Sequence, residues 1–136
     1  MQKTHLNPDV VAHPGGIYSQ LVKVDVGDAT FLFVAGQVGQ DKDGKVVGED
    51  DVAAQADQTY KNIAAILASE GASLSDIARA TTYITDMSQR PAVSAIRKRL
   101  FPVNPPATTL VEVGALAGDD WLIEVEVTAV IPRKTG

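Results

Sequence analysis

Hydrophobic and polar residues alternate in the first regular segment of the chain. Positions 18–26 place valines at every second residue and charged residues between them, which predicts a half-buried strand. Gly27-Asp28 follows as a turn signal, and residues 30–36 (TFLFVAG) are more uniformly apolar. The two segments together predict a β-hairpin.

Two later segments have the hydrophobic period of a helix. From Asp50 to Glu70, apolar residues recur at every third or fourth position, and Gly71 can cap the C-terminus of such a helix. A second, shorter apolar stripe runs through residues 93–100. Ser88 can cap this second helix, and Pro91 is tolerated in its first turn.

Three further segments, residues 77–85, 108–113 and 121–131, are rich in β-branched residues or alternate, and predict strands. Residues 1–16 contain prolines and two adjacent glycines, so we expect a loosely attached N-terminal segment there. The expected order is β-β-α-β-α-β-β, in a single α+β domain that spans residues 1–136.

Two helices can cover only one face of a sheet of this size. The other face should then carry apolar residues that nothing in the same chain buries. A closed oligomer is the natural way to bury such a face.

Composition narrows the class of protein. The 136 residues are 45% hydrophobic and 21% charged, without cysteine, which is typical of a globular chain and excludes disulfides and thiol nucleophiles. The net charge of −5 argues against a broad nucleic-acid surface. No signal-peptide core or membrane-length apolar run is present, so we expect a cytoplasmic protein with neither a nucleic acid nor a membrane as partner.

Recognised cofactor and metal motifs are missing. The sequence has no P-loop, GxGxxG or GxSxG segment. Residues 41–44 (DKDG) resemble the start of a calcium loop, but Val52 stands where that loop needs a glutamate. His5 and His13 fall in the irregular first segment. We therefore expect no metal and no cofactor, and chemistry that rests on carboxylates, hydroxyls, water and backbone groups.

The last predicted strand carries the most informative pattern. Glu124 and Glu126 alternate with apolar residues and so share one face, with about 7 Å between their Cα atoms. Charges on the outer face of an edge strand would explain this pattern, and patterning alone favours that interpretation. Alternatively, one glutamate is half-buried at a subunit interface, where burial raises its pKa and lets it act on a water molecule.

Several segments, in this order and spacing, resemble the Rid family, also called YjgF-like proteins or, in an older label, endoribonuclease L-PSP. The resemblance runs from Gly16 to Val130. The matching segments are YSQ at 18–20, VAGQ at 34–37, QTYKNIAAILASEG at 58–71, TTYITDM at 81–87, PA at 106–107, VEV at 111–113 and IEVE at 123–126.

This resemblance implies a mixed sheet with two helices on one face, as in chorismate mutase. It also implies a homotrimer with three small-molecule sites in the clefts between subunits. Family members with known activity hydrolyse reactive enamines or imines to ketones and ammonia, and they need no cofactor.

The resemblance also assigns roles to single residues. Glu124 corresponds to the glutamate that holds the hydrolytic water, and Leu110 to a residue whose backbone carbonyl helps to place that water. Tyr18 corresponds to a tyrosine at the rim of the cleft. Gly36 corresponds to a glycine whose backbone approaches the ligand, where a side chain would collide.

The chain departs from the deaminase pattern at Thr108. The deaminase subgroup has an arginine at this position, which grips the substrate carboxylate through two charge-assisted hydrogen bonds. Thr108 and Thr109 can donate only neutral hydrogen bonds, and Ser94 stands where an asparagine is common. We expect a Rid-like deaminase with an altered ligand or, alternatively, a trimer that binds a small molecule without catalysis.

Two further features stay open at this level. Arg90, Arg97 and Arg99 could compensate for the missing arginine, although charges on a helix are usually solvated. Trp121 could line the cleft or anchor the turn before the last strand in the core, and we favour the anchor.

Overall fold

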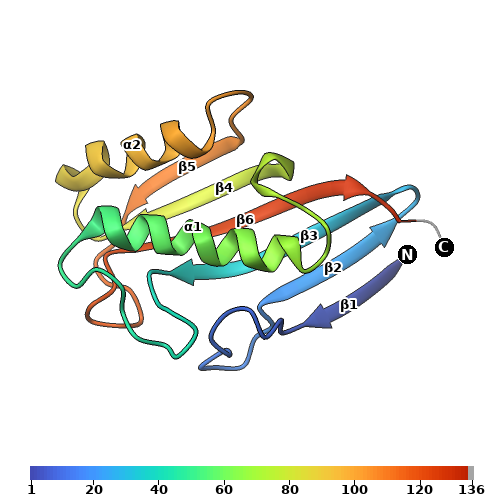
Figure 1. Ribbon diagram of the computed structural model, residues 1–136, viewed down its shortest axis with the longest axis horizontal. Helices are drawn as coiled ribbons and strands as arrows, with labels where there is room; N and C mark the ends of the chain where they lie inside the picture. Colours follow the sequence, from blue (N-terminus) through green and yellow to red (C-terminus); the bar gives the residue numbers. More distant parts are fainter. Residues whose placement is uncertain (135–136) are drawn as a thin grey trace.

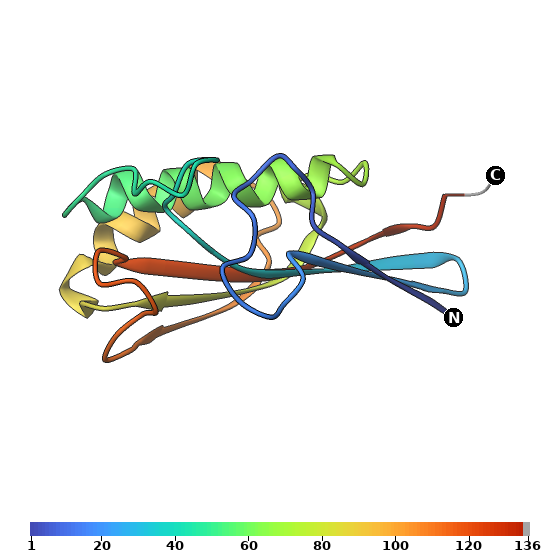
Figure 2. The same ribbon diagram turned by 90° about the horizontal axis from the view of Figure 1, so that it is seen from below.

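The computed structural model describes residues 1–134, which form one six-stranded sheet with two helices packed on a single face (Figures 1 and 2). The strands are β1 (Gln2–Leu6), β2 (Leu21–Val26), β3 (Ala29–Val38), β4 (Ile77–Ile84), β5 (Ala107–Glu112) and β6 (Ile123–Pro132). The helices are α1 (Val52–Ala68) and α2 (Arg90–Leu100). Two short 3₁₀ turns, η1 (Leu74–Asp76) and η2 (Met87–Gln89), directly precede β4 and α2.

The strands lie in the order β1-β2-β3-β6-β4-β5. All neighbours are antiparallel except β4 and β5, so the sheet is mixed. The predicted α+β class, with a mixed sheet and two helices on one face, is therefore confirmed. The last strand, β6, lies at the centre between β3 and β4 (Figure 1). The assumption that Glu124 and Glu126 belong to an edge strand is wrong.

The alternation of β2 and β3 sorts their side chains between the two faces of the sheet. Leu21 and Asp25 face the helices and are buried, and the Asp25 carboxylate accepts a 2.5 Å hydrogen bond from the Thr30 hydroxyl. The valines of β2 project from the opposite face. Gly27 turns the chain between the two strands with a φ of 59°, which suits glycine. The predicted hairpin is present.

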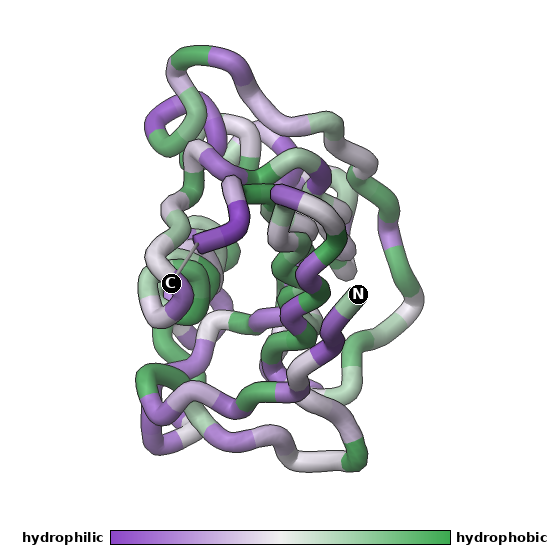
Figure 3. Tube along the Cα trace, turned by 90° about the vertical axis from the view of Figure 1, so that its right-hand side faces the viewer, coloured by the Kyte–Doolittle hydropathy of each residue, from purple (hydrophilic) through white to green (hydrophobic). Residues whose placement is uncertain are grey.

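The core lies between α1 and the sheet. Asp51 caps α1 by accepting a hydrogen bond from the backbone N–H of Ala54, and the helix stripe of Ile63, Ile66 and Leu67 is completely buried. Figure 3 shows hydrophobic and hydrophilic positions alternating along the chain, as a sheet with two distinct faces requires. No helix within residues 1–134 is long and apolar enough to cross a membrane.

We call the sheet face opposite the helices the open face. No element of residues 1–134 covers it, as Figure 2 shows. Phe33 is 45% exposed there, and Phe31 stacks on it with 6.3 Å between ring centroids. Val22 and Val24 lie opposite these rings on β2. The expectation of an uncovered apolar face therefore holds within this chain.

The N-terminal segment is more ordered than the sequence predicts. Residues Gln2–Leu6 form β1, which pairs antiparallel with β2, and Val11 is only 4% exposed in the core. The strand has no apolar alternation, because it is held at the sheet edge by backbone hydrogen bonds instead of a buried face. The predicted order therefore lacked one strand at its start.

Candidate active site

A cavity of about 870 Å³ lies at the end of β3 and β6, beside the N-terminal loop. Tyr18, Gly36 and Glu124, three of the residues singled out from the sequence, line it together. We call this space the Glu124 cavity. Its remaining lining includes Gln20, Gln37, Lys42, Asp43, Trp121 and Glu126.

The approach of Glu124 to Gly36 depends on a bulge in β3. Val34 pairs with Val127 and Gln37 pairs with Val125, so β3 has one more residue than β6 between these two pairs. Bulges of this kind re-aim side chains and are common beside active sites. Here, a side-chain carbon on Gly36 would lie 2.5 Å from Oε2 of Glu124. Only a residue without a side chain at position 36 leaves room for the Glu124 carboxylate here.

Burial and charge both change the acidity of Glu124. The side chain is half-buried, and this desolvation raises its pKa above the usual 4.5, with a further rise from the negative charge of Glu126. The Tyr83 hydroxyl donates a 2.7 Å hydrogen bond to Oε1 of Glu126. Accordingly, the pKa of Tyr83 is raised, mainly by this hydrogen bond. The pair therefore contains the exposed carboxylate of Glu126, which accepts from Tyr83, and the half-buried carboxylate of Glu124, whose pKa is raised.

A buried amide pair fixes one wall of the cavity. Gln37 donates from Nε2 to Oε1 of Gln20 at 2.8 Å, and Gln20 donates in turn to the backbone carbonyl of Ala12 at 2.9 Å. The backbone N–H of Ala35 donates to the carbonyl of Gln20. These bonds tie the N-terminal loop to β3 and so position Tyr18, which is 50% exposed at the rim.

Trp121 also lines the cavity, and the structure does not place this residue in the core. Trp121 is partly exposed, lines the Glu124 cavity and packs over Gly118, where a side-chain carbon would meet the indole at 2.7 Å. Gln55 of α1 fixes the turn, because it donates to the carbonyl of Asp120 and accepts from the N–H of Leu122. The interpretation of Trp121 as a core anchor is therefore wrong.

The lining of the Glu124 cavity is acidic. Three carboxylates, those of Asp43, Glu124 and Glu126, face one ammonium group, that of Lys42. His13 also lines the cavity, with its Nε2 3.4 Å from Oδ1 of Asp9. Within residues 1–134, no group of three or more acidic or histidine side chains is arranged to hold a metal ion.

The other predicted site residues, Thr108, Thr109 and Leu110, lie on β5 and do not line this cavity. Thr82 pairs with both Leu110 and Val125, whose side chain is buried on the helix side. Residues in register share a face, so Thr108 and Leu110 face the helices, whereas Glu124 faces the open side. Within one chain, these two groups of residues are separated by the sheet.

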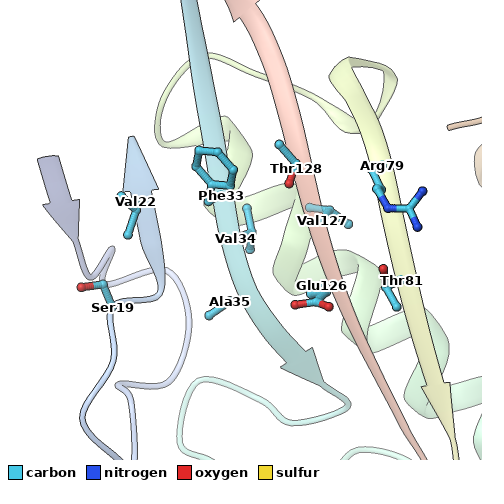
Figure 4. Close-up of a pocket in the computed structure, with 10 residues that line it drawn as sticks. All are labelled: Ser19, Val22, Phe33, Val34, Ala35, Arg79, Thr81, Glu126, Val127 and Thr128. Atoms are coloured by element: carbon cyan, nitrogen blue, oxygen red, sulfur yellow. The ribbon is translucent and has the colours of Figure 1, made fainter. Parts of the chain in front are cut away.

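Thr109 lies on the open face, in register with Thr81 and Glu126. Both of these partners line a second and smaller pocket of about 450 Å³ (Figure 4). Figure 4 shows Arg79 and Thr81 on β4 and Glu126 on β6 along its wall. Arg79 donates a 2.9 Å hydrogen bond to the Thr109 hydroxyl. Glu126 lines both pockets, so the two spaces are adjacent on the open face.

Sequence patterning assigned no role to Arg79 and left Trp121 ambiguous. The alternation of β4 could place Arg79 on the same face as Tyr83, but no local signal shows that β5 lies beside it. The three arginines of α2 lie on the helix side of the sheet, away from the Glu124 cavity of the same chain. Arg99 forms an ion pair with Asp57 of α1.

Comparison with known proteins gives consistent results. A family model described as Endoribonuclease L-PSP matches residues 10–131. The chain is 32% identical to human 2-iminobutanoate/2-iminopropanoate deaminase over 119 residues, 86% of this chain and 83% of the human one. It is 34% identical to a RutC family protein of Pyrococcus abyssi over 129 residues, 95% and 98% of the two chains. A solved Rid-family structure from Yersinia pestis covers 96% of this chain and all of its own, with a TM-score of 0.84 at 30% identity.

Proposed function

The chain belongs to the Endoribonuclease L-PSP family, which is the Rid family, and on that premise we propose that it hydrolyses a small imine or enamine at the Glu124 cavity. The observation that carries this proposal is the half-buried carboxylate of Glu124 above Gly36, inside a cavity of substrate size. The name of the human relative, a 2-iminobutanoate/2-iminopropanoate deaminase, supports the same reaction class.

The proposed reaction uses one carboxylate in two roles. Ionised Glu124 accepts a proton from a water molecule as the water oxygen forms a bond to the imine carbon and the C=N electrons move to nitrogen. The proton then passes from Glu124 to that nitrogen. Glu124 next accepts the proton of the new hydroxyl and delivers it to the amino group, and the C–N bond breaks as the carbonyl forms. Imine and water therefore yield a carbonyl compound and ammonia. The raised pKa of Glu124 suits a group that must both accept and return this proton.

The proposed site is completed by a second copy of the chain, in a homotrimer. In one chain, Thr108 and Leu110 lie on the opposite side of the sheet from Glu124. However, β5 is an edge strand, and an edge presents unpaired backbone carbonyls and N–H groups to a neighbour. The apolar open face supports association, because Phe33 and Val26 are 45% and 44% exposed on it. A cytoplasmic location also stays a prediction.

A second function, binding without catalysis, is favoured by one observation. Thr108 is exposed and stands where the deaminase subgroup has its carboxylate-binding arginine. RNA cleavage, suggested by the family description, receives no support from the cavity. Three carboxylates against one lysine would repel a phosphate backbone.

The test is a timed imine-hydrolysis assay. An amino-acid oxidase or an amine oxidase generates imines in solution, and their decay is followed with and without the protein. We expect faster decay with wild type and a loss of at least about 100-fold with Glu124→Gln, in a protein whose oligomer size is unchanged. Ligand-dependent stabilisation without any product would support the binding function instead. Undiminished activity of Glu124→Gln would overturn the role of this residue.

A further inference from the structure

The carboxylates that line the Glu124 cavity have no cationic partner in their own chain. Glu124, Glu126 and Asp43 line the cavity, and none of the three forms an ion pair within residues 1–134. Lys42 carries the one ammonium group among the described lining residues, and it is exposed and equally without an ion pair there. Neighbouring negative charges repel one another, and a bound cation relieves that repulsion. The lining therefore favours a positively charged ligand over an anion.

A buried amide adds an unused acceptor to the same lining. Gln37 is 4% exposed, and its Nε2 donates both to Oε1 of Gln20 at 2.8 Å and to the carbonyl of Ala35 at 3.0 Å. These two acceptors fix which end of the amide is the nitrogen. Within residues 1–134, Oε1 of Gln37 accepts no hydrogen bond, yet it is not sealed from solvent. Because Gln37 lines the Glu124 cavity, this oxygen is available to a ligand that carries N–H groups.

Two aromatic rings also line the cavity. Trp121 is partly exposed and Tyr18 is 50% exposed. The face of an aromatic ring attracts an ammonium group, and the indole of tryptophan does so most strongly. Within residues 1–134, no group of acidic or histidine side chains is arranged to hold a metal ion. Carboxylates together with aromatic rings and an amide oxygen therefore suit an organic ammonium group.

The spacing of the two glutamates of β6 indicates where such a group would lie in the substrate. Glu124 and Glu126 project from one face of the strand, with about 7 Å between their Cα atoms. Glu124 is the proposed base, so Glu126 is left to contact another part of the substrate. The Tyr83 hydroxyl donates to Oε1 of Glu126, and within residues 1–134 no group donates to Oε2. An imine with an ammonium group two or three carbons from the imine carbon fits this arrangement.

We propose that the Glu124 cavity prefers an imine that carries an ammonium group and lacks a carboxylate, of the kind made by oxidising one end of a diamine. This inference rests on the proposed function, whose substrate class it names. Glu126 and Trp121 would hold the ammonium group, and Oε1 of Gln37 would accept a hydrogen bond from a substrate N–H. A substrate carboxylate would be repelled by the same lining, and Thr108 has no positive charge to hold it.

The test compares two imines of equal length. An amine oxidase makes one from 1,3-diaminopropane, which keeps an ammonium group, and the other from butan-1-amine, which has a methyl group in its place. The decay of each imine is timed with and without the protein, and the catalysed rate is divided by the uncatalysed rate. Wild type should prefer the ammonium imine about 10-fold in kcat/KM.

Variants of the lining test which residues cause this preference. Glu126→Gln and Trp121→Leu should each reduce it to about threefold or less, and Trp121→Phe, which keeps an aromatic face, should retain part of it. The ratio between the two imines is the readout, because a change in the acidity of Glu124 affects both imines alike. Glu49→Gln and Asp28→Asn remove exposed carboxylates that do not line the cavity, and both should keep the wild-type preference.

A second readout does not depend on turnover. The stable probe 3-aminopropan-1-ol should raise the melting temperature of wild type more than butan-1-ol does, and Glu126→Gln should lose the difference. Ammonium chloride at the same ionic strength separates a general salt effect from binding. If the amino alcohol stabilises wild type through Glu126 but neither imine is hydrolysed, the ammonium subsite stands and the proposed reaction fails. If wild type hydrolyses both imines equally well through Glu124, the reaction stands and the inference is overturned.

Discussion

The carboxylate of Glu124 lies against the backbone of Gly36, so closely that a side-chain carbon on Gly36 would stand 2.5 Å from Oε2. This contact joins the bulge of β3 to the central strand β6. The position of the carboxylate therefore depends on the absence of a side chain at one residue of the neighbouring strand.

The first prediction concerns that glycine. In Gly36→Ala, the methyl group would displace the carboxylate of Glu124, which is the movable end of a long side chain. We expect kcat/KM for imine hydrolysis to fall about 100-fold, because a shift of about 1 Å in a catalytic group is enough for such a loss. The melting temperature should change little, since the side chain can swing aside. Full activity in Gly36→Ala would show that the Glu124 position is not set by this contact.

A nearby glycine should behave in the opposite way. At Gly39, a side-chain carbon would lie 2.7 Å from Cα of Gln55 in α1, and helix backbone cannot swing aside. Gly39→Ala should lower the free energy of unfolding by about 1–3 kcal/mol in urea denaturation. Gly114 has no atom within 4 Å of such a carbon, so Gly114→Ala is the matched control and should stay near wild type. Equal stability of the two variants would argue against this packing of the segment after β3 on α1.

The third prediction links Glu124 to stability. Its pKa is raised above 4.5 in the folded protein, so the folded state binds this proton more tightly than the unfolded chain. Stability therefore falls as pH rises from 4.5 through the raised pKa. Glu124→Gln removes the buried charge and should melt at a higher temperature than wild type at pH 7. The difference should vanish below about pH 4, where glutamate is protonated in both states. A less stable variant at pH 7 would contradict the raised pKa.

The fourth prediction concerns the pH dependence of catalysis. The negative charge of Glu126 contributes to the raised pKa of Glu124, and Glu124 must be ionised to accept the water proton. Glu126→Gln should therefore move the acid limb of the kcat/KM profile to lower pH. Glu49→Gln removes an exposed charge that does not line the cavity, and its profile should match wild type. An acid limb that moves to higher pH in Glu126→Gln would mean that Glu126 lowers the pKa of Glu124, which contradicts this prediction.

Much of this arrangement could be predicted from the alternation of residues. In β6, the period of two predicted that Glu124 and Glu126 share a face while Ile123 and Val125 enter the core. The same pattern could not show that β6 is central, because strand order depends on contacts between segments far apart in sequence. It also could not reveal the bulge in β3, where one extra residue brings Gly36 beneath Glu124.

Other features have no local signal in the sequence. The β1 strand is polar and is held by backbone pairing at the edge, so its hydrophobic pattern resembles that of a loop. Trp121 is positioned by Gln55, a residue 66 positions earlier in the chain, through the backbone of Asp120 and Leu122. The face on which Thr108 and Leu110 lie is fixed by the register of β5 on β4, which the sequence does not reveal.

The most direct test of a site shared between two chains is a mixing experiment with two inactive variants. One is Glu124→Gln, and the other is Thr108→Trp, whose indole would block the cleft of the neighbouring chain. Each is first purified as the proposed trimer and assayed alone, and the two are then co-assembled in equal amounts. A shared site predicts recovery of about one quarter of wild-type activity, because about one site in four pairs an intact Glu124 with an intact β5. No recovery in the mixed trimers, or full activity of Thr108→Trp alone, would contradict a site completed by the neighbouring β5.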